Sequence, residues 1–348
     1  MNPNSHHLRN QINRELAAKL VQEESFARKT VSFYRYVEIE DPKAMRDQLF
    51  VEWSELKVFG RIYVAKEGIN AQLNVPEPNW DKFVEKLSTH PEFADMPFKI
   101  ALEEKAPSFI KLTIKVKQQI VADGLTPDDY DISNVGTHLE PEDFHAALED
   151  DDVVVVDMRN QYESEIGHFE GAVCPDVDTF KEQLPMVKEM LEKKKPKKVL
   201  LYCTGGIRCE KASAYLKHNG IDNVYQLKGG IIRYAEEMEK RGVESKFKGK
   251  NFVFDERRAE RVTDDVLSSC HQCEHPSDEH TNCKNEMCNL LFIQCGACAT
   301  QWDGCCSEDC KKIAQLPDEE RRELRKNWQR SSTFKRYRRS LRPKECLT

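Results

Sequence analysis

The sequence lacks the features that would anchor it in a membrane or export it from the cell. It has no run of about eighteen apolar residues, which a transmembrane helix of ordinary length requires. Residues 1–20 contain neither an apolar core nor a small-residue cleavage site, so we expect no signal peptide and a cytoplasmic location. The composition, with 32% charged residues and a formal net charge of −7, is typical of a soluble protein without a membrane partner.

The sequence also lacks the motifs that commonly hold a redox cofactor. It has no G-x-G-x-x-G dinucleotide fingerprint, and we identify no set of two histidines and one carboxylate for iron. No organic cofactor is therefore indicated.

Cysteine is abundant by contrast: nine of the thirteen cysteines fall between residues 270 and 310. In a chain without an export signal, such clustering favours metal ligation over disulfides. The cluster contains two C-x-x-C pairs, each of which can aim two thiolates at one tetrahedral ion. We therefore predict a small segment that folds around two structural zinc ions. The eight predicted ligands are Cys270, Cys273, Cys283, Cys288, Cys295, Cys298, Cys306 and Cys310.

Several alternatives stay open for this segment. One of the nine cysteines is spare, and we expect it to be Cys305 or Cys306. The ligands of the two ions could be interleaved along the chain, so the sequence does not fix their pairing. His271, His275 and His280 are alternative ligands, although each fits a bystander role better. An iron–sulfur cluster is the second candidate for the metal.

Strand and helix patterns divide the chain into further units. Residues 28–124 give the order β-α-β-β-α-β, which predicts a ferredoxin-like α+β domain. The polar stretch 123–134 resembles a linker. Residues 133–245 hold short apolar strands separated by helices, as in an α/β domain with a parallel sheet. The cysteine-rich segment occupies 250–312, and a basic, partly disordered tail is predicted for 313–348.

The tail is strongly basic. From Lys311 onwards the chain has 13 Lys or Arg residues against 5 Asp or Glu. Trp328, Phe334 and Tyr337 are interleaved with these cations, a composition that suits stacking on bases and neutralising phosphates. An anionic partner such as nucleic acid and a merely solvated tail are both consistent with this charge.

A cysteine lies between a strand and a helix in the stretch "KKVLLYCTGGIRCEKASAYLKHNG", where parallel sheets place their ligands. Converging amides, the helix N-terminus and Arg208 would favour a thiolate, an anion or a persulfide at Cys203. Only four residues separate Cys203 from Arg208, one fewer than in phosphate-cleaving cysteine loops, which argues against a phosphatase. These four are Thr204, Gly205, Gly206 and Ile207.

Cys209 follows at the start of the predicted helix, six positions after Cys203. It could resolve a persulfide or a sulfenic acid at Cys203 by forming a disulfide. It could equally be a buried residue in the first turn of the helix.

These residues resemble a rhodanese domain. Cys203 matches the sulfur-carrying cysteine, and Asp157 and Arg159 match a D-x-R motif. These two could form an ion pair that holds the loop, or Asp157 could be a plain structural polar group. We expect Glu163 and His168 to be structural polar groups. The other matching positions are Gly167, Gly171, Ala172 and the glycine pair Gly229 and Gly230.

The four-part order resembles the bacterial tRNA uridine hydroxylase family of rhodanese-domain proteins. The distinctive motifs are "AKEGINAQLNV", "CTGGIRCEK", "GKNFVFDER" and the cysteine cluster. The resemblance implies an oxidoreductase that uses molecular oxygen to hydroxylate carbon 5 of the tRNA wobble uridine, giving 5-hydroxyuridine. It implies the anticodon region of tRNA as partner, rather than DNA. We take Cys203 and Arg208 as the catalytic residues.

The chemistry of the loop leaves two other function classes open. The first is a sulfurtransferase that carries a persulfide on Cys203, and the second is a non-catalytic module that binds tRNA or protein. For hydroxylation, we hypothesise that Cys203 adds to carbon 6 of uracil and makes carbon 5 electron-rich, ready for an oxidant.

Overall fold

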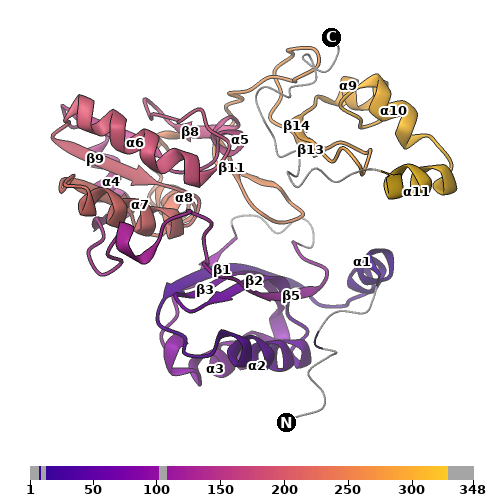
Figure 1. Ribbon diagram of the computed structural model, residues 1–348, viewed down its shortest axis with the longest axis horizontal. Coiled ribbons are helices and arrows are strands. Elements are labelled where there is room, and N and C mark those ends of the chain that lie inside the picture. The colour runs from indigo at the N-terminus through magenta and orange to yellow at the C-terminus, as the bar shows by residue number, and fades with distance from the viewer. Residues whose placement is uncertain (1–7, 9–12, 102–107, 328–348) are drawn as a thin grey trace.

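The computed structural model describes residue 8 and residues 13–101 and 108–327. Figure 1 shows three parts: the N-terminal domain, a second α/β domain, and a small C-terminal segment. Within the described ranges, no helix is both long and apolar enough to span a bilayer. Trp328, Phe334 and Tyr337 of the predicted basic tail lie outside the described residues.

The N-terminal domain has the predicted β-α-β-β-α-β order. Its sheet has the strand order β4-β1-β3-β2-β5, in which β4 occupies the edge beside β1 and β5 adds a strand parallel to β2 at the other edge. The ferredoxin-like prediction is therefore confirmed, with β5 as an addition. Its elements are α1 (Arg14–Gln22), β1 (Arg28–Tyr36), α2 (Pro42–Glu55), β2 (Phe59–Ala65), β3 (Gly68–Pro76), the 3-10 turn Glu77–Asn79, α3 (Trp80–Ser88), the 3-10 turn Pro91–Phe93, β4 (Lys99–Ile100) and β5 (Leu112–Val116).

Helices α2 and α3 cover one face of this sheet (Figure 1). Alternation along the strands sends Val31 and Phe33 of β1 into that core, where Phe33 meets Trp53 of α2 and Phe83 of α3. The side chains that alternate with them are more polar and point to the opposite face. That face is turned toward the other two parts of the molecule.

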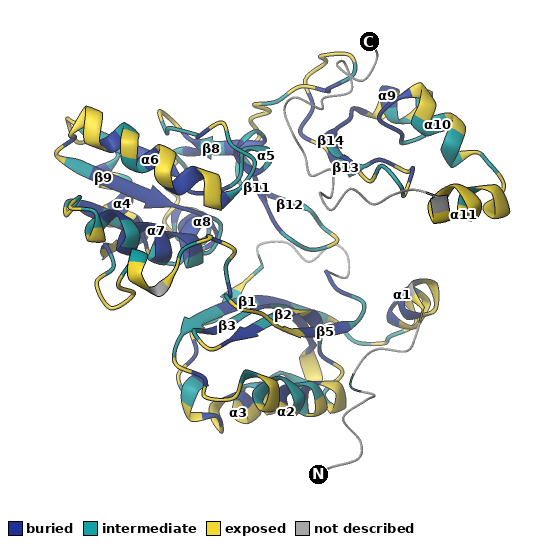
Figure 2. Ribbon diagram, in the orientation of Figure 1, coloured by how far each residue is buried: buried dark blue, intermediate teal, exposed yellow. Residues whose placement is uncertain are grey.

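The second domain has the predicted parallel sheet, with the strand order β6-β10-β9-β7. Strand β9 is central and buried, with helices on either side, as its apolar sequence requires (Figure 2). The rhodanese-like α/β prediction is confirmed. The elements are the 3-10 turn Pro127–Asp129, β6 (Thr137–Leu139), α4 (Pro141–Ala147), β7 (Val153–Asp157), α5 (Gln161–Ser164), β8 (Gly167–Phe169), α6 (Phe180–Lys194), β9 (Lys198–Tyr202), α7 (Ile207–His218), β10 (Val224–Leu227) and α8 (Gly230–Arg241).

The C-terminal segment is joined to the second domain by β11, which pairs antiparallel with β8. Most of the remaining segment is loop, with one two-stranded ribbon made by β13 and β14. Its elements are β11 (Phe247–Phe252), β12 (Ala259–Arg261), β13 (His280–Asn282), β14 (Leu291–Ile293), α9 (Gly296–Gln301), α10 (Glu308–Ala314) and α11 (Asp318–Asn327).

The polar stretch predicted as a linker is held against both domains. Lys211 of α7 lies 2.7 Å from a carboxylate oxygen of Glu67, 3.1 Å from Asp123 and 2.6 Å from the Tyr130 hydroxyl. The side chains of Lys211 and Asp123 are both fully buried. This cluster therefore fixes the N-terminal domain against the second domain.

Replacement of Lys211 by alanine should destabilise the protein by about 3–5 kcal/mol, because it leaves the Asp123 carboxylate buried without its cation. Denaturant unfolding measures the loss. The control is Lys193→Ala, which removes an exposed ion pair with Glu189 and should cost less than about 1 kcal/mol. Equal effects of the two substitutions would contradict a structural role for the buried cluster.

Candidate functional site

The predicted cysteine loop connects the end of β9 to the start of α7. The Gly206 amide donates a hydrogen bond to the sulfur of Cys203 over 3.1 Å. Gly206 adopts a φ of 100°, which its lack of a side chain permits. At the back of the loop, the Ile231 amide donates to the Cys203 carbonyl oxygen over 3.0 Å. Gly230 packs so closely that a Cβ there would lie 2.6 Å from that oxygen. The closing glycines therefore shape the loop around the sulfur.

The two cysteines of the loop differ in acidity. Burial by itself raises the pKa of Cys203, but a hydrogen bond from Cys209, the charge of Arg208 and nearby backbone amides outweigh burial and lower this pKa to about 5. Burial and the neighbouring Cys203 raise the pKa of Cys209 well above its usual value. Cys203 is therefore a thiolate at neutral pH, and Cys209 keeps its proton and donates it.

Arg208 is held by Glu163 of α5. The guanidinium donates two hydrogen bonds to the Glu163 carboxylate, over 2.6 and 2.8 Å, and a third to the Thr204 hydroxyl over 3.3 Å. The Glu163 side chain has no exposed surface. Glu163 is more than the plain structural group expected from the sequence, because its position orients the Arg208 cation beside the thiolate.

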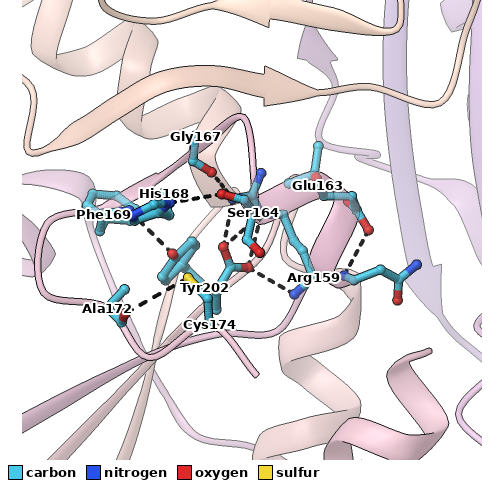
Figure 3. A network of polar contacts seen from close by, with 12 residues as sticks. Arg159, Glu163, Ser164, Gly167, His168, Phe169, Ala172, Cys174 and Tyr202 are labelled. Atoms are coloured by element: carbon cyan, nitrogen blue, oxygen red, sulfur yellow. Dashed lines mark hydrogen bonds and ion pairs between the residues drawn. The ribbon is translucent and has the colours of Figure 1, made fainter. Parts of the chain in front are cut away.

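Asp157 and Arg159 form the expected ion pair, fully buried at 2.7 Å. Arg159 also donates to the Gly167 carbonyl oxygen over 2.6 Å and lies near the Tyr202 ring, as Figure 3 shows. The hydrogen bonds of this pair thus fix the end of β7 against the start of β8. Arg159 also lies 5.8 Å from the centre of the Tyr202 ring, directly before the loop, whereas the side chain that binds Arg208 of the loop is Glu163.

Two other residues in Figure 3, the matched His168 and the neighbouring Cys174, lie away from the loop. The His168 ring bonds to the Ser164 carbonyl oxygen over 2.8 Å. Cys174 is half-buried, and its pKa is raised to about 12, mainly by burial, so it stays a neutral thiol. Neither residue reaches the loop through a hydrogen bond that the described residues contain.

The N-terminal domain covers the loop, which the sequence did not predict. The Tyr34 hydroxyl donates to Glu210 of α7 over 3.1 Å, and the Tyr36 hydroxyl donates to the Ile207 carbonyl oxygen over 3.2 Å. The Lys99 ammonium lies 4.3 Å from the centre of the Tyr34 ring, and burial lowers its pKa to about 8. These hydrogen bonds join residues more than 100 positions apart in the chain, so no local sequence pattern could have predicted them.

A cavity of about 880 Å³ opens beside the loop, with walls from all three parts of the molecule. Its volume falls within the range of about 300–1,000 Å³ that is usual for ligand sites. Cys203 borders the cavity but has no exposed surface, because the loop and its cover enclose the sulfur. The polar lining includes Ser32, Tyr34, Arg61, Tyr63, Asn70, Gln72, Lys99, Lys115, Tyr162, Asp178, Thr204, Arg208, Asp255, Arg257, Glu260, Asn282 and Asn289.

The eight predicted metal ligands form two groups of four. The first group is Cys270, Cys273, Cys295 and Cys298, and the second is Cys283, Cys288, Cys306 and Cys310. The groups are interleaved along the chain. Within each group, all four sulfurs lie within 4.8 Å of one another. Either group could hold a metal ion.

The sulfur spacing fits a tetrahedral ion. Sulfurs are 3.6 Å apart between Cys273 and Cys295, and 3.7 Å apart between Cys288 and Cys306. Metal–sulfur bonds of about 2.3 Å in a tetrahedron would place the sulfurs about 3.8 Å apart. The cysteine outside both groups is Cys305, one of the two residues that we expected to be spare. The three histidines lie in neither group, and His271 instead contacts Glu165 at 3.1 Å.

The pKa of Cys203 can be measured from the ultraviolet absorbance of its thiolate as the pH is varied. The signal is the difference in absorbance between the protein and its Cys203→Ala variant. We expect this difference to appear with a midpoint near pH 5, instead of near the usual value of about 8.5. Cys209→Ala removes the hydrogen bond to the thiolate and should move the midpoint upward, whereas Cys174→Ala should leave it unchanged. A midpoint near 8.5 in the unmodified protein would contradict the described electrostatics.

Three family models match successive parts of the chain. The "UPF0176 acylphosphatase like domain" matches residues 28–120, the "Rhodanese-like domain" residues 140–237, and the "Rhodanase C-terminal" model residues 248–311. Among solved structures, an As-Sb reductase from Leishmania major shares 16% identity with this chain. It covers 36% of this chain and 92% of its own, with a TM-score of 0.28.

Curated relatives match nearly the whole chain. A "tRNA uridine(34) hydroxylase" of Leptospira interrogans serogroup Icterohaemorrhagiae serovar Lai (strain 56601) is 53% identical over 319 residues, covering 92% of this chain and 87% of the relative. A relative with the same name from Yersinia enterocolitica serotype O:8 / biotype 1B (strain NCTC 13174 / 8081) is 52% identical, covering 91% of each chain. This chain therefore belongs to the tRNA uridine(34) hydroxylase family.

Proposed function

We propose that this protein hydroxylates carbon 5 of the wobble uridine of tRNA, giving 5-hydroxyuridine, with molecular oxygen as co-substrate. The relatives named tRNA uridine(34) hydroxylase, about half identical over nine-tenths of the chain, support the reaction. The observation that carries the proposal in this chain is a cysteine thiolate at the wall of a cavity large enough for a nucleotide. Cys203 is then the active-site residue and Arg208 its electrostatic support.

The chemistry begins with addition of the Cys203 thiolate to carbon 6 of uracil, which moves an electron pair toward carbon 5 and O4. Carbon 5 then takes an oxygen atom from the oxidant. Loss of the carbon 5 proton and expulsion of the thiolate restore the uracil ring. With molecular oxygen as oxidant, the balance requires two electrons and two protons from a reductant and releases one water.

Access to the sulfur is part of this proposal. Cys203 has no exposed surface, and Tyr34 and Lys99 lie over its loop. Uracil therefore reaches the sulfur only when this cover moves or the loop opens. Closure of the cover over the bound base would then exclude water from the reaction.

A second candidate is a sulfurtransferase with a Cys203 persulfide as the sulfur carrier. It is favoured by one specific observation, the amide of Gly206 aimed at the sulfur within a short loop. The two candidates separate by product: incubation with thiosulfate would label Cys203 and place sulfur in tRNA for a transferase, while a hydroxylase yields 5-hydroxyuridine without sulfur transfer.

We propose zinc as the ion of both cysteine groups. Four thiolates at tetrahedral spacing, without an open position, are the usual donor set of structural zinc. The segment has few large apolar side chains, so bound metal would supply much of its folding free energy. The ions would hold the segment as one wall of the cavity, and no step of the reaction is assigned to them.

Replacement of Cys203 by alanine should reduce formation of 5-hydroxyuridine about 1,000-fold or more, because the thiolate that adds to carbon 6 is lost. The assay is nucleoside mass spectrometry of tRNA treated with purified protein, oxygen and reductant. Binding of tRNA should persist in the variant, and Cys174→Ala serves as the matched control. Undiminished hydroxylation by the Cys203→Ala protein would remove Cys203 from the chemistry.

The metal content should be two zinc ions per chain, one for each group of four cysteines. Cys283→Ala should lower the measured content to about one ion and destabilise the segment, because three thiolates hold the ion less tightly. Cys305→Ala is the matched control and should retain both ions, since Cys305 lies outside the two groups. Elemental analysis gives the count, and iron in place of zinc would contradict the assignment.

A further inference from the structure

The open face of the N-terminal sheet forms the cavity wall that faces the cysteine loop. Strand register places side chains of this face in two rows across the sheet. One row runs from Tyr34 through Asn70 and Tyr63 to Lys115. The other is formed by Lys99, Ser32, Gln72 and Arg61. All eight residues line the cavity.

The charge of this wall is positive. Arg61, Lys99 and Lys115 contribute three cations, and no carboxylate of the N-terminal domain lines the cavity among the described residues. None of the three cations has an ion pair with a described carboxylate. The wall therefore favours an anionic ligand.

Acidic groups do line the cavity on its other walls. Asp255 and Glu260 both pair with Arg257, so this group of one cation and two carboxylates carries one net negative charge. Asp178 lies on the wall of the second domain. The sheet face is therefore the wall with net positive charge, and the acidic groups lie across the cavity from it.

The row from Tyr34 to Lys115 combines two aromatic rings, an amide and a cation. It crosses four strands, a span of about 14 Å at about 4.8 Å between neighbours. Successive stacked nucleotides in a strand are about 3.4 Å apart, so the row is long enough to contact more than one nucleotide. Tyr34 anchors one end of the row beside the loop through its bond to Glu210. The row thus extends from the loop of Cys203 to the exposed side chain of Lys115, near the exposed Arg61 of the second row.

We infer that this sheet face binds single-stranded RNA, namely the anticodon-loop nucleotides beside the wobble uridine, and the inference rests on the proposed function. A base stacks on the Tyr63 ring, the phosphates lie near Arg61 and Lys115, and the Gln72 amide offers a donor and an acceptor to a base edge. An acidic peptide would use the cations but would have no need of an aromatic ring and amides in the same rows.

The test measures affinity for a synthetic anticodon stem–loop RNA with uridine at the wobble position, over a series of salt concentrations. The double variant Arg61→Gln/Lys115→Gln should bind more weakly. Its slope of log affinity against log salt should fall by about 1.4, or about 0.7 for each lost phosphate contact. The matched control, Lys43→Gln/Lys82→Gln, removes two exposed charges on the helices of the other face and should change neither quantity.

Substitutions of Tyr63 distinguish the contribution of base stacking to RNA binding from the contribution of charge. Tyr63→Ala should weaken RNA binding roughly 5- to 150-fold, and Tyr63→Phe should keep wild-type affinity because the ring remains. Thermal melting of each variant verifies that the domain is folded. If the charge variants lose affinity while Tyr63→Ala does not, the face is a purely electrostatic surface and the base site is overturned.

Hydroxylation of the same RNA is measured in parallel. Failure of the wild-type protein to form 5-hydroxyuridine would overturn the proposed function. Wild-type hydroxylation together with unchanged RNA affinity in the sheet-face variants would overturn this inference alone. Weaker binding and slower hydroxylation in the charge variants and in Tyr63→Ala, with both kept at wild-type level in Tyr63→Phe, would support it.

Discussion

The central constraint on this structure is a thiolate that remains charged although it is fully buried. Burial alone would keep Cys203 neutral, so the surrounding residues must stabilise a negative charge. Arg208 supplies the opposite charge, Gly206 an amide, and Cys209 a thiol proton. Each of these groups needs its own support, and Glu163 gives it to Arg208 through a buried two-point hydrogen bond. The α/β domain thus maintains one reactive sulfur, and its loop is too short for phosphate.

The other two parts of the chain cover the loop of Cys203 and enclose a cavity beside it, which a rhodanese domain alone would not do. Tyr34, Tyr36 and Lys99 of the N-terminal sheet lie over the loop, and the cysteine segment closes another side of the cavity. The Lys211 cluster fixes the first two parts in this arrangement. A sulfur carrier would need only the loop and access to a donor. A cavity with an aromatic and cationic wall suits a reaction on a large, anionic substrate such as tRNA.

Much of the fold and part of the site could be predicted from the sequence. The helix and strand periods, the C-x-x-C spacing and the short loop after β9 are local patterns, so they predicted the three units, the eight clustered cysteines and the position of Cys203. The interleaving of the metal ligands is a property of the folded chain, and the sequence left it open. The contact of Glu163 with Arg208 and the cover formed by Lys99 were missed for the same reason. Each joins residues 45 or more positions apart, which no periodicity can show.

We propose Cys203 as the reacting group in hydroxylation of the wobble uridine. The most direct test is mass spectrometry of tRNA nucleosides from a strain that lacks this protein, complemented with either the wild-type chain or Cys203→Ser. We predict that the deletion removes 5-hydroxyuridine and the nucleosides derived from it, and that only the wild-type chain restores them. Restoration by Cys203→Ser, or loss of a thiolated nucleoside instead, would contradict the account.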